Sequence, residues 1–437
     1  MFNYYFGLAL RSLRRNPVLT LLMVVTIGVG IGASMTTLTV FRAMDADPMP
    51  HKSMQLYVPQ IDSWGPTEQA MDSVDKLADQ LSYIDAVALM RAHAAPHQMA
   101  AYATLFALTP ANPELKPFKA EGRATFSDFF SMFEVPFQYG GAWSAAEEEA
   151  HTPVIVINQE LNKKLFGGAN SVGRSINLDD HDYRIIGVMA VWNPMPRFYD
   201  LTNENFARTA QVFLPFNVAI ERQMASFGNT NCTNHSDAGW QGLLDSDCVW
   251  IQFWAELPTP KAAEDYRVWL NNYAAEQQRS GRFNWPARTQ LRNLKEWLTY
   301  EHVVSDETRI LVLVSFSFLL VCVLNAMGLM LAKFMGRAAD IGVRRALGAN
   351  RRAILAQCLI EAGVVGLAGG LLGVVLTVFG LTALRGVLSE QILELTNLDP
   401  AGVGIALLLA VFATIAAGLY PTWRAAHVQP AWQLKAQ

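Results

Sequence analysis

The chain has 437 residues, of which 51% are hydrophobic and only 16% are charged. Soluble proteins carry about 25% charged residues, whereas the mean hydropathy of +0.18 is low for a protein made only of membrane spans. The net charge of −4 gives no support for a nucleic-acid partner, and four cysteines are too few for a disulfide scaffold. The composition therefore indicates a folded soluble domain joined to a minority of membrane helices.

Four apolar stretches are long enough to cross a bilayer, which takes about 20 residues. The first, from Val18 to Phe41, contains no charge, and it is longer than the apolar core of a signal peptide, so we expect an uncleaved anchor. The sequence predicts, in order, a cytoplasmic amphipathic helix at 1–17, a first span at 18–42, a large domain at 43–308, a second span at 309–333, a cytoplasmic loop at 334–353, a third span at 354–384, a short outer link at 385–400, a fourth span at 401–421 and a cytoplasmic tail at 422–437.

Basic residues set the orientation of these spans, because they gather on the cytoplasmic side of a membrane. Three arginines and no acidic residue precede the first span, and residues 333–353 hold six basic residues against Asp340 alone. Residues 43–308 instead hold 20 Lys and Arg against 33 Asp and Glu. Both termini and the 334–353 loop are therefore predicted to be cytoplasmic, and the large domain to lie outside.

The large domain is predicted to be α+β. Its strand-rich part contains a buried run at Pro153–Ile157, a helix at Gln159–Phe166 that Gly167 ends, and a hairpin with a polar turn at 179–182. Further helices are expected at Val74–Leu81, Lys261–Tyr273 and Leu291–Tyr300. The predicted fold is thus a membrane protein with four transmembrane helices and an α+β periplasmic domain inserted between the first and second.

Two cysteines, Cys232 and Cys248, lie in this outer domain, where an oxidising compartment favours a disulfide. A disulfide that closes this loop would contribute about 3 kcal/mol, and the alternative is two unrelated thiols. Cys322 and Cys358 lie in or beside spans and are expected to be plain packing residues.

No catalytic motif is present: the sequence contains no G-x-x-x-x-G-K-[ST] phosphate loop, no H-E-x-x-H and no G-x-S-x-G. The acidic residues and the histidine at 179–182 resemble a metal site, but a solvated turn is the more ordinary interpretation. We therefore expect a non-catalytic chain with no metal site and no cofactor of its own.

Polar residues within the spans have a functional and a structural interpretation. Glu361 is shallow enough to snorkel to the interface or to pair with a loop arginine. Asn325 is expected to form an interhelical hydrogen bond rather than part of a proton or substrate path. Glycines allow close helix packing or dimer contact, and the candidates are Gly28, Gly32, Gly366 and Gly370.

The loop between the second and third spans is the most informative stretch of the chain. Its pattern predicts a short amphipathic helix, a stop at Gly348 and a basic restart into the third span. It could lie on anionic lipid headgroups, or an apolar knob at Ala346 and Leu347 could dock into a cytoplasmic partner. The candidate contact residues are Arg344, Arg345, Ala346, Leu347, Gly348, Ala349, Arg351 and Arg352.

This stretch, from Asp340 to Ala349 with Arg351-Arg352 and Glu361-Ala362, closely resembles the signature of MacB-like and FtsX-like ABC transporter permeases. Three further blocks resemble the same family in order and place, at 9–17, 153–188 and 417–430. The segment 215–255 matches no family block that we can identify, and Asp340 stands where Glu is usual.

The resemblance implies a permease of the type VII, mechanotransmission class in a bacterial inner membrane. It also implies a cytoplasmic ABC ATPase dimer that holds ATP and Mg and grips the 334–353 loop. The chain carries no fused ATPase domain, so we expect a separate ATPase subunit and a second permease copy or paralogue. A periplasmic adaptor and a TolC-like outer-membrane channel would receive periplasmic cargo.

Two alternatives remain. An FtsX-like or lipoprotein-release-like permease would use the same mechanics to regulate a periplasmic hydrolase or to extract lipoproteins. A membrane-anchored periplasmic enzyme is the third possibility, and the missing catalytic motif counts against it.

Overall fold

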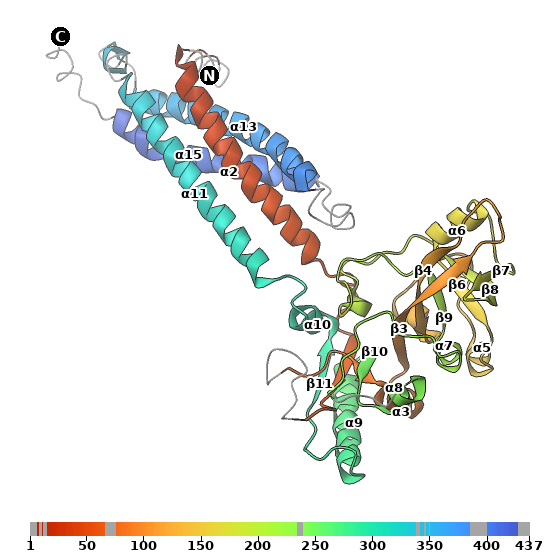
Figure 1. Cartoon of the computed structure of the whole chain (residues 1–437). Helices are drawn as coiled ribbons and strands as arrows, with labels where there is room; N and C mark the ends of the chain where they lie inside the picture. Colours follow the sequence, from red (N-terminus) through yellow and green to blue (C-terminus); the bar gives the residue numbers. More distant parts are fainter. Residues whose placement is uncertain are drawn as a thin grey trace. The chain divides into compact units, whose positions relative to one another are not determined.

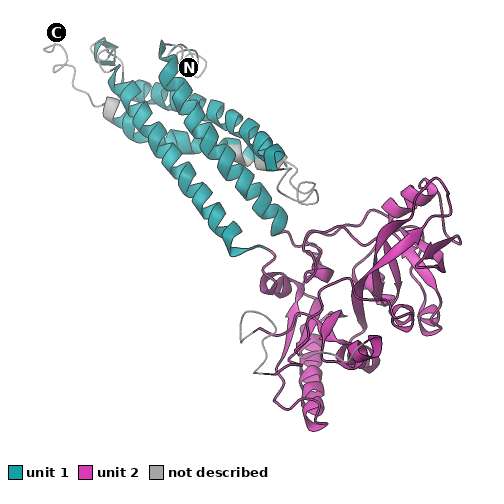
Figure 2. Ribbon diagram, viewed as in Figure 1, with its two compact units in different colours: residues 1–45, 304–437 teal, residues 46–303 magenta. Residues whose placement is uncertain are grey.

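The fold is described from a computed structural model, which describes residues 7, 11, 15–65, 76–233, 239–337, 341–344, 347–348, 350–384 and 400–426 (Figure 1). The chain divides into two compact units (Figure 2). One, the helical unit, contains residues 1–45 and 304–437, and the other, the sheet unit, contains residues 46–303. The sheet unit is therefore an insertion between two parts of the helical unit.

The helical unit contains four long helices: α2 (Pro17–Met44), α11 (Asp306–Met335), α13 (Arg351–Ala383) and α15 (Pro400–Ala426). Among the described residues, α2, α11 and α13 are long and apolar enough to cross a membrane, while α15 holds a shorter apolar stretch, Ala410–Trp423. The four predicted spans fall on these four helices, and the count of four spans stays a prediction. The predicted segments 1–17, 385–400 and 422–437 lie largely outside the described residues.

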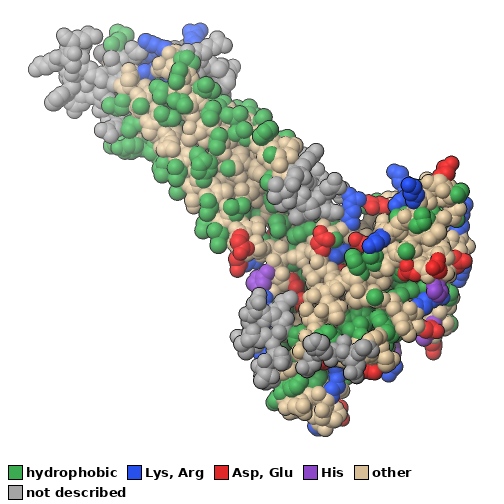
Figure 3. Space-filling model, viewed as in Figure 1, with side chains coloured by type: hydrophobic (Ala, Val, Ile, Leu, Met, Phe, Trp, Pro, Cys, Tyr) green, Lys and Arg blue, Asp and Glu red, His purple; other side chains and the backbone are tan. Residues whose placement is uncertain are grey.

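The two units differ in the charge of their surfaces, as the sequence predicts. Hydrophobic side chains cover the visible face of the helical unit, whereas charged side chains gather on the sheet unit (Figure 3). A helix that is apolar around its whole circumference is typical of a membrane span.

The sheet unit is built on one mixed sheet with the strand order β11-β1-β10-β3-β4-β9-β6-β8-β5; β2 also pairs with β10, and β7 with β3 and β8. The strands are β1 (Leu56–Ile61), β2 (Leu81–Ser82), β3 (His97–Thr109), β4 (Phe118–Thr125), β5 (Phe137–Gly140), β6 (Val154–Ile157), β7 (Ser175–Leu178), β8 (His181–Met189), β9 (Val212–Pro215), β10 (Val249–Glu256) and β11 (Thr289–Asn293).

Both faces of this sheet are buried. In β6, Ile155 and Ile157 enter one apolar cluster while Val154 and Val156 enter another, because successive side chains of a strand point to opposite faces. Short helices and α9 complete the unit: α3 (Tyr83–Ala92), α4 (Asp128–Met132), α5 (Ala145–Glu149), α6 (Gln159–Phe166), η1 (Phe198–Asp200), α7 (Phe216–Glu221), α8 (Trp240–Asp245), α9 (Pro260–Arg279) and α10 (Leu294–Tyr300).

Two helix predictions are wrong, one throughout its described residues and one at its start. The described residues of the predicted helix Val74–Leu81 are not helical, because Leu81 pairs with Ile251 of β10. The helix instead begins after Ser82, whose hydroxyl accepts a hydrogen bond from the Asp85 N–H at 3.2 Å. Likewise, the first residues of the predicted helix Leu291–Tyr300 belong to β11, and α10 begins only at Leu294.

Candidate coupling segment and its buried ion cluster

The candidate site is the segment between α11 and α13, residues 336–350, which we call the coupling segment. Residues 341–344 are helical, and Gly348 has a φ of +93°, a left-handed conformation that favours glycine. The helix α13 then restarts at Arg351, where the Asn350 side chain caps it by accepting a hydrogen bond from the Arg352 N–H at 3.2 Å. Of the predicted contact residues, Arg345, Ala346 and Ala349 lie outside the described residues.

This segment presents an apolar side chain among basic ones. Leu347 is 84% exposed and Val343 is 56% exposed. Arg344, Arg351 and Arg352 are exposed as well, and the Arg344 guanidinium donates to Gln357 Oε1 of α13 at 3.2 Å. An exposed leucine flanked by arginines fits a docking knob for a partner with an apolar, acidic groove.

A buried ion cluster ties the helices together where this segment begins and ends. Glu361 of α13 pairs with Lys333 of α11 at 2.6 Å and with Arg337 at 3.5 Å, and the Glu361 and Lys333 side chains are only 3% and 1% exposed. The Lys333 ammonium also donates to Thr20 Oγ1 of α2 at 3.3 Å. Three helices therefore meet in one polar cluster beside the coupling segment.

Sequence reasoning predicted that Glu361 pairs with a loop arginine, and the structure gives it Arg337 together with Lys333. Lys333 was counted only as a positive charge that marks the cytoplasmic end of the second span. The signal in the sequence is a lysine at the end of one predicted span and a carboxylate near the start of the next, because a buried carboxylate requires a cation.

The predicted packing glycines lie at contacts between helices of this chain. A Cβ at Gly28 would lie 2.8 Å from Leu372 of α13, and one at Gly32 would lie 2.7 Å from Leu376. A Cβ at Gly366 would overlap Thr414 Oγ1 of α15, and one at Gly370 would lie 3.0 Å from Ala410. Small residues at these positions let the helix backbones approach closely.

Asn325 does not form the interhelical hydrogen bond that we predicted within the described part of the chain. Its side chain is exposed on α11. Only 11% of the most apolar stretch of α11 is buried within the chain, against 39% for α2 and for α13. The open face of α11 therefore carries one amide among apolar side chains.

The sheet unit contains the predicted disulfide between Cys232 and Cys248, which are 16 positions apart in the sequence. Thr233 donates to the Asp247 carboxylate at 2.6 Å beside it, and Asn231 forms an isolated bridge with Val249 of β10. Cys322 and Cys358 are buried in α11 and α13 as free cysteines. The disulfide thus fastens the 231–248 loop to the start of β10.

The acidic turn at 179–182 has a structural role. Asp179 and Asp180 form the turn between β7 and β8, both with positive φ, and Asp179 Oδ1 accepts a hydrogen bond from the Ala107 N–H at 2.8 Å. Across the described ranges, no group of three His, Cys, Asp or Glu side chains is placed to hold a metal ion.

Comparison with known proteins locates these features in a family. The model of the MacB-like periplasmic core domain matches residues 20–264 and therefore includes the whole segment 215–255, for which we recognised no family block. The model of the FtsX-like permease C-terminal region matches residues 312–430 and includes the coupling segment.

Curated relatives are export proteins that carry an ATP-binding part. The macrolide export ATP-binding/permease protein MacB of Salmonella paratyphi A is 26% identical over 253 residues, which is 58% of this chain and 34% of that protein. The pyoverdine export ATP-binding/permease protein PvdT of Pseudomonas aeruginosa is 28% identical over 311 residues, 71% of this chain and 41% of that protein. The matched part of the chain thus covers only about a third to two fifths of these relatives' length.

Among solved structures, the periplasmic region of MacB from Actinobacillus actinomycetemcomitans aligns with a TM-score of 0.37 and 11% identity, over 60% of this chain and 98% of that one. The family assignment depends on the sequence models, the first of which matches more than half of the chain. The chain belongs to the MacB/FtsX-like family of ABC transporter permeases.

Proposed function

We propose that the chain is a non-catalytic permease subunit that couples ATP hydrolysis by a cytoplasmic ABC ATPase to a conformational change in the sheet unit. The main support for this proposal is the exposed Leu347, which is flanked by arginines and lies between α11 and α13. In this account the ATPase grips the coupling segment, and the buried Glu361 cluster makes the ends of α2, α11 and α13 move together.

Chain connectivity supports the second half of the proposal. The strand β1 follows α2 along the chain, β11 precedes α11, and the two strands pair antiparallel from Tyr57↔Asn293 to Ile61↔Thr289. A movement of α2 relative to α11 therefore reaches the sheet unit through two neighbouring strands. The cargo is then moved outside the membrane by mechanotransmission, with no passage between the helices.

The proposal also names the proteins with which the chain would assemble and the membrane in which it would lie. The export names of the relatives favour efflux of periplasmic cargo through an adaptor and a TolC-like outer-membrane channel. ATP and Mg would be bound by the ATPase. The chain would lie in a bacterial inner membrane with both termini cytoplasmic and the sheet unit periplasmic, because the basic residues gather at 333–353.

Affinity purification from native membranes tests the coupling contact. Wild-type protein should retain a chain that carries a G-x-x-x-x-G-K-[ST] nucleotide loop, and Leu347→Asp or Arg344→Glu should lose it. Val191→Asp is the matched control, since Val191 is an exposed apolar residue (76%) of the sheet unit. If Leu347→Asp retained the ATPase as well as Val191→Asp does, the coupling assignment would be wrong. Recovery of a murein hydrolase in place of an adaptor would favour the FtsX-like alternative.

A further inference from the structure

The sheet unit contains a polar cavity that the coupling mechanism does not use. Its volume is about 480 Å³, within the range of about 300–1,000 Å³ that small-molecule sites occupy. Strands β3 and β4 form one wall, and the segments 197–210 and 227–229 form the others. The residues that matter for its chemistry are Glu121, Arg123, Arg197, Asp200, Asn203 and Glu204.

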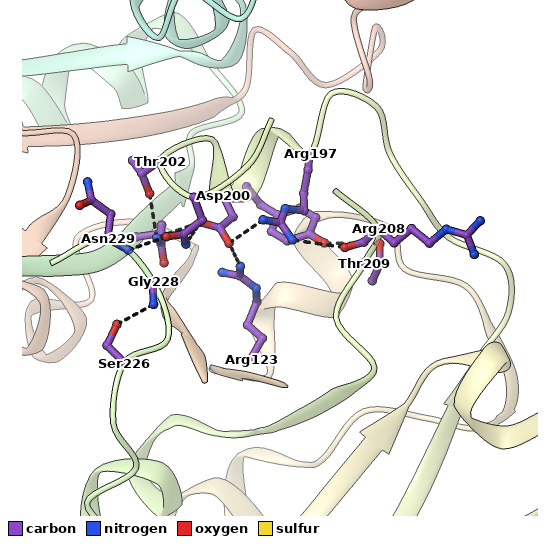
Figure 4. A network of polar contacts seen from close by, with 12 residues as sticks. Arg123, Arg197, Asp200, Thr202, Arg208, Thr209, Ser226, Gly228 and Asn229 are labelled. Atoms are coloured by element: carbon purple, nitrogen blue, oxygen red, sulfur yellow. Dashed lines mark hydrogen bonds and ion pairs between the residues drawn. The ribbon is translucent and has the colours of Figure 1, made fainter. Parts of the chain in front are cut away.

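Two buried arginines share one carboxylate at this cavity (Figure 4). The Arg123, Arg197 and Asp200 side chains are 1%, 8% and 0% exposed, and both guanidinium groups pair with Asp200 Oδ2. Asp200 Oδ1 is occupied as well, because it accepts hydrogen bonds from the Asn203 amide and, at 3.0 Å, from the Gln252 amide. The cluster therefore carries one positive charge more than its carboxylate can balance.

Three of the buried arginine nitrogens in this cluster lack a hydrogen-bond acceptor among the described residues. Arg123 Nε and Nη1 and Arg197 Nε are buried and have no acceptor within the part of the chain that the structure describes. Arginine does not deprotonate in proteins, and leaving a buried charge uncompensated costs several kcal/mol. Burial raises the pKa of Tyr199, whose ring lies 4.9 Å from the Arg123 guanidinium, so its neutral phenol supplies no counter-charge.

The outer part of the cavity has the opposite charge. Glu121 and Glu204 line it, and both side chains are exposed. Glu121 and Arg123 are two positions apart on β4, so they point to the same face of the sheet, about 6.6 Å apart along the strand. A simple anion would be repelled by the carboxylates of Glu121 and Glu204. A simple cation would leave the arginine donors without a hydrogen-bond acceptor.

The walls are held in place without a ligand. The Phe227 N–H donates to the Ala103 carbonyl of β3 at 2.8 Å, and the Asn229 N–H donates to Asn203 Oδ1. A Cβ at Gly228 would lie 2.7 Å from Asn203 Oδ1, so glycine lets this segment approach Asn203. A site whose walls are fixed in advance binds at a lower entropic cost.

We propose that this cavity binds a small zwitterionic solute, whose carboxylate points toward Arg123 and Arg197 and whose ammonium group lies between Glu121 and Glu204. The site is independent of the proposed coupling function: it would bind the solute whether or not the ATPase docks on the coupling segment. Binding forms only ion pairs and hydrogen bonds, and no covalent bond changes.

Isothermal titration calorimetry of the full-length protein in detergent tests the proposal with three probes of matched length. The zwitterion 5-aminopentanoate should bind saturably, and pentanoate and pentylamine, which lack the ammonium and the carboxylate respectively, should bind at least about tenfold more weakly. Glu121→Gln should reduce the preference for 5-aminopentanoate over pentanoate at least about threefold. Glu160→Gln, which changes an exposed carboxylate outside the cavity lining, should leave that preference unchanged.

Four results would overturn the proposal. The first is no saturable heat with 5-aminopentanoate at concentrations above about 1 mM, which would mean that water alone satisfies the arginines. The second is tighter or equal binding of pentanoate, and the third is tighter or equal binding of pentylamine. The fourth is an unchanged preference in Glu121→Gln, which would place the bound solute elsewhere on the protein.

Discussion

At the scale of the residue, the buried charge of Glu361 requires cations beside it. A carboxylate that is 3% exposed is tolerated because Lys333 lies 2.6 Å away and Arg337 contributes a second cation. The same three residues join α11, α13 and the start of the coupling segment. Their electrostatic cost is thus tied to the position at which the ATPase is proposed to act.

Removing one partner of this pair should destabilise the protein more than removing both. We expect Glu361→Gln and Lys333→Met each to lower the free energy of unfolding by about 3 kcal/mol. Glu361→Gln leaves the buried Lys333 without its carboxylate, and Lys333→Met leaves the buried Glu361 with Arg337 alone, 3.5 Å away. The double variant should cost less than either single variant, and therefore clearly less than the sum of the two. Unfolding in detergent measures this, with Glu307→Gln at the exposed start of α11 as the control. Additive losses would show that the two side chains do not interact.

At the scale of the element, glycine positions decide how closely the helices pack. Gly366 faces α15 at a point where no side chain fits, whereas a Cβ at Gly363 would lie 3.7 Å from Ile415 Cδ1, an ordinary contact distance. Both glycines lie within α13, so replacing either one by alanine changes helix propensity by a similar amount. A comparison of the two alanine variants therefore separates the effect of helix packing on stability from the effect of helix propensity.

We expect Gly366→Ala to lower the free energy of unfolding by about 1–3 kcal/mol, because the added methyl group pushes α13 away from Thr414 of α15. Gly363→Ala should be neutral or slightly stabilising. Thermal unfolding of the two variants in the same detergent compares them directly. Equal melting temperatures would mean that α13 and α15 do not pack closely at Gly366.

Element boundaries were predictable from the sequence where local signals decide them. The helix Gln159–Phe166 begins and ends where its cap residues, Asn158 and Gly167, place it. The predicted helix Val74–Leu81 failed because pairing of Leu81 with β10, far away in the sequence, overrides helix propensity. The polar network around Asp200 could not be predicted for the same reason: Arg123 and Gln252 are 77 and 52 positions away from it.

At the scale of the whole molecule, one chain alternates between two units. The chain leaves the helical unit after α2, forms the sheet unit and returns at α11. Because β1 and β11 are neighbours at one end of the strand order, both connections enter the sheet unit through one strand pair. This connectivity gives the coupling segment a covalent path to the sheet unit, and the proposed ATPase would act along that path.

Hydrogen–deuterium exchange measures whether nucleotide at the ATPase changes the sheet unit. The permease and its ATPase would be reconstituted in nanodiscs, and the exchange of amides in residues 46–303 would be measured with and without ATP and vanadate. We predict that nucleotide changes exchange at β1 and β11 in the wild type and in Val191→Asp, and that the change is absent in Leu347→Asp. Unchanged exchange throughout residues 46–303, while the wild-type complex hydrolyses ATP, would contradict the account.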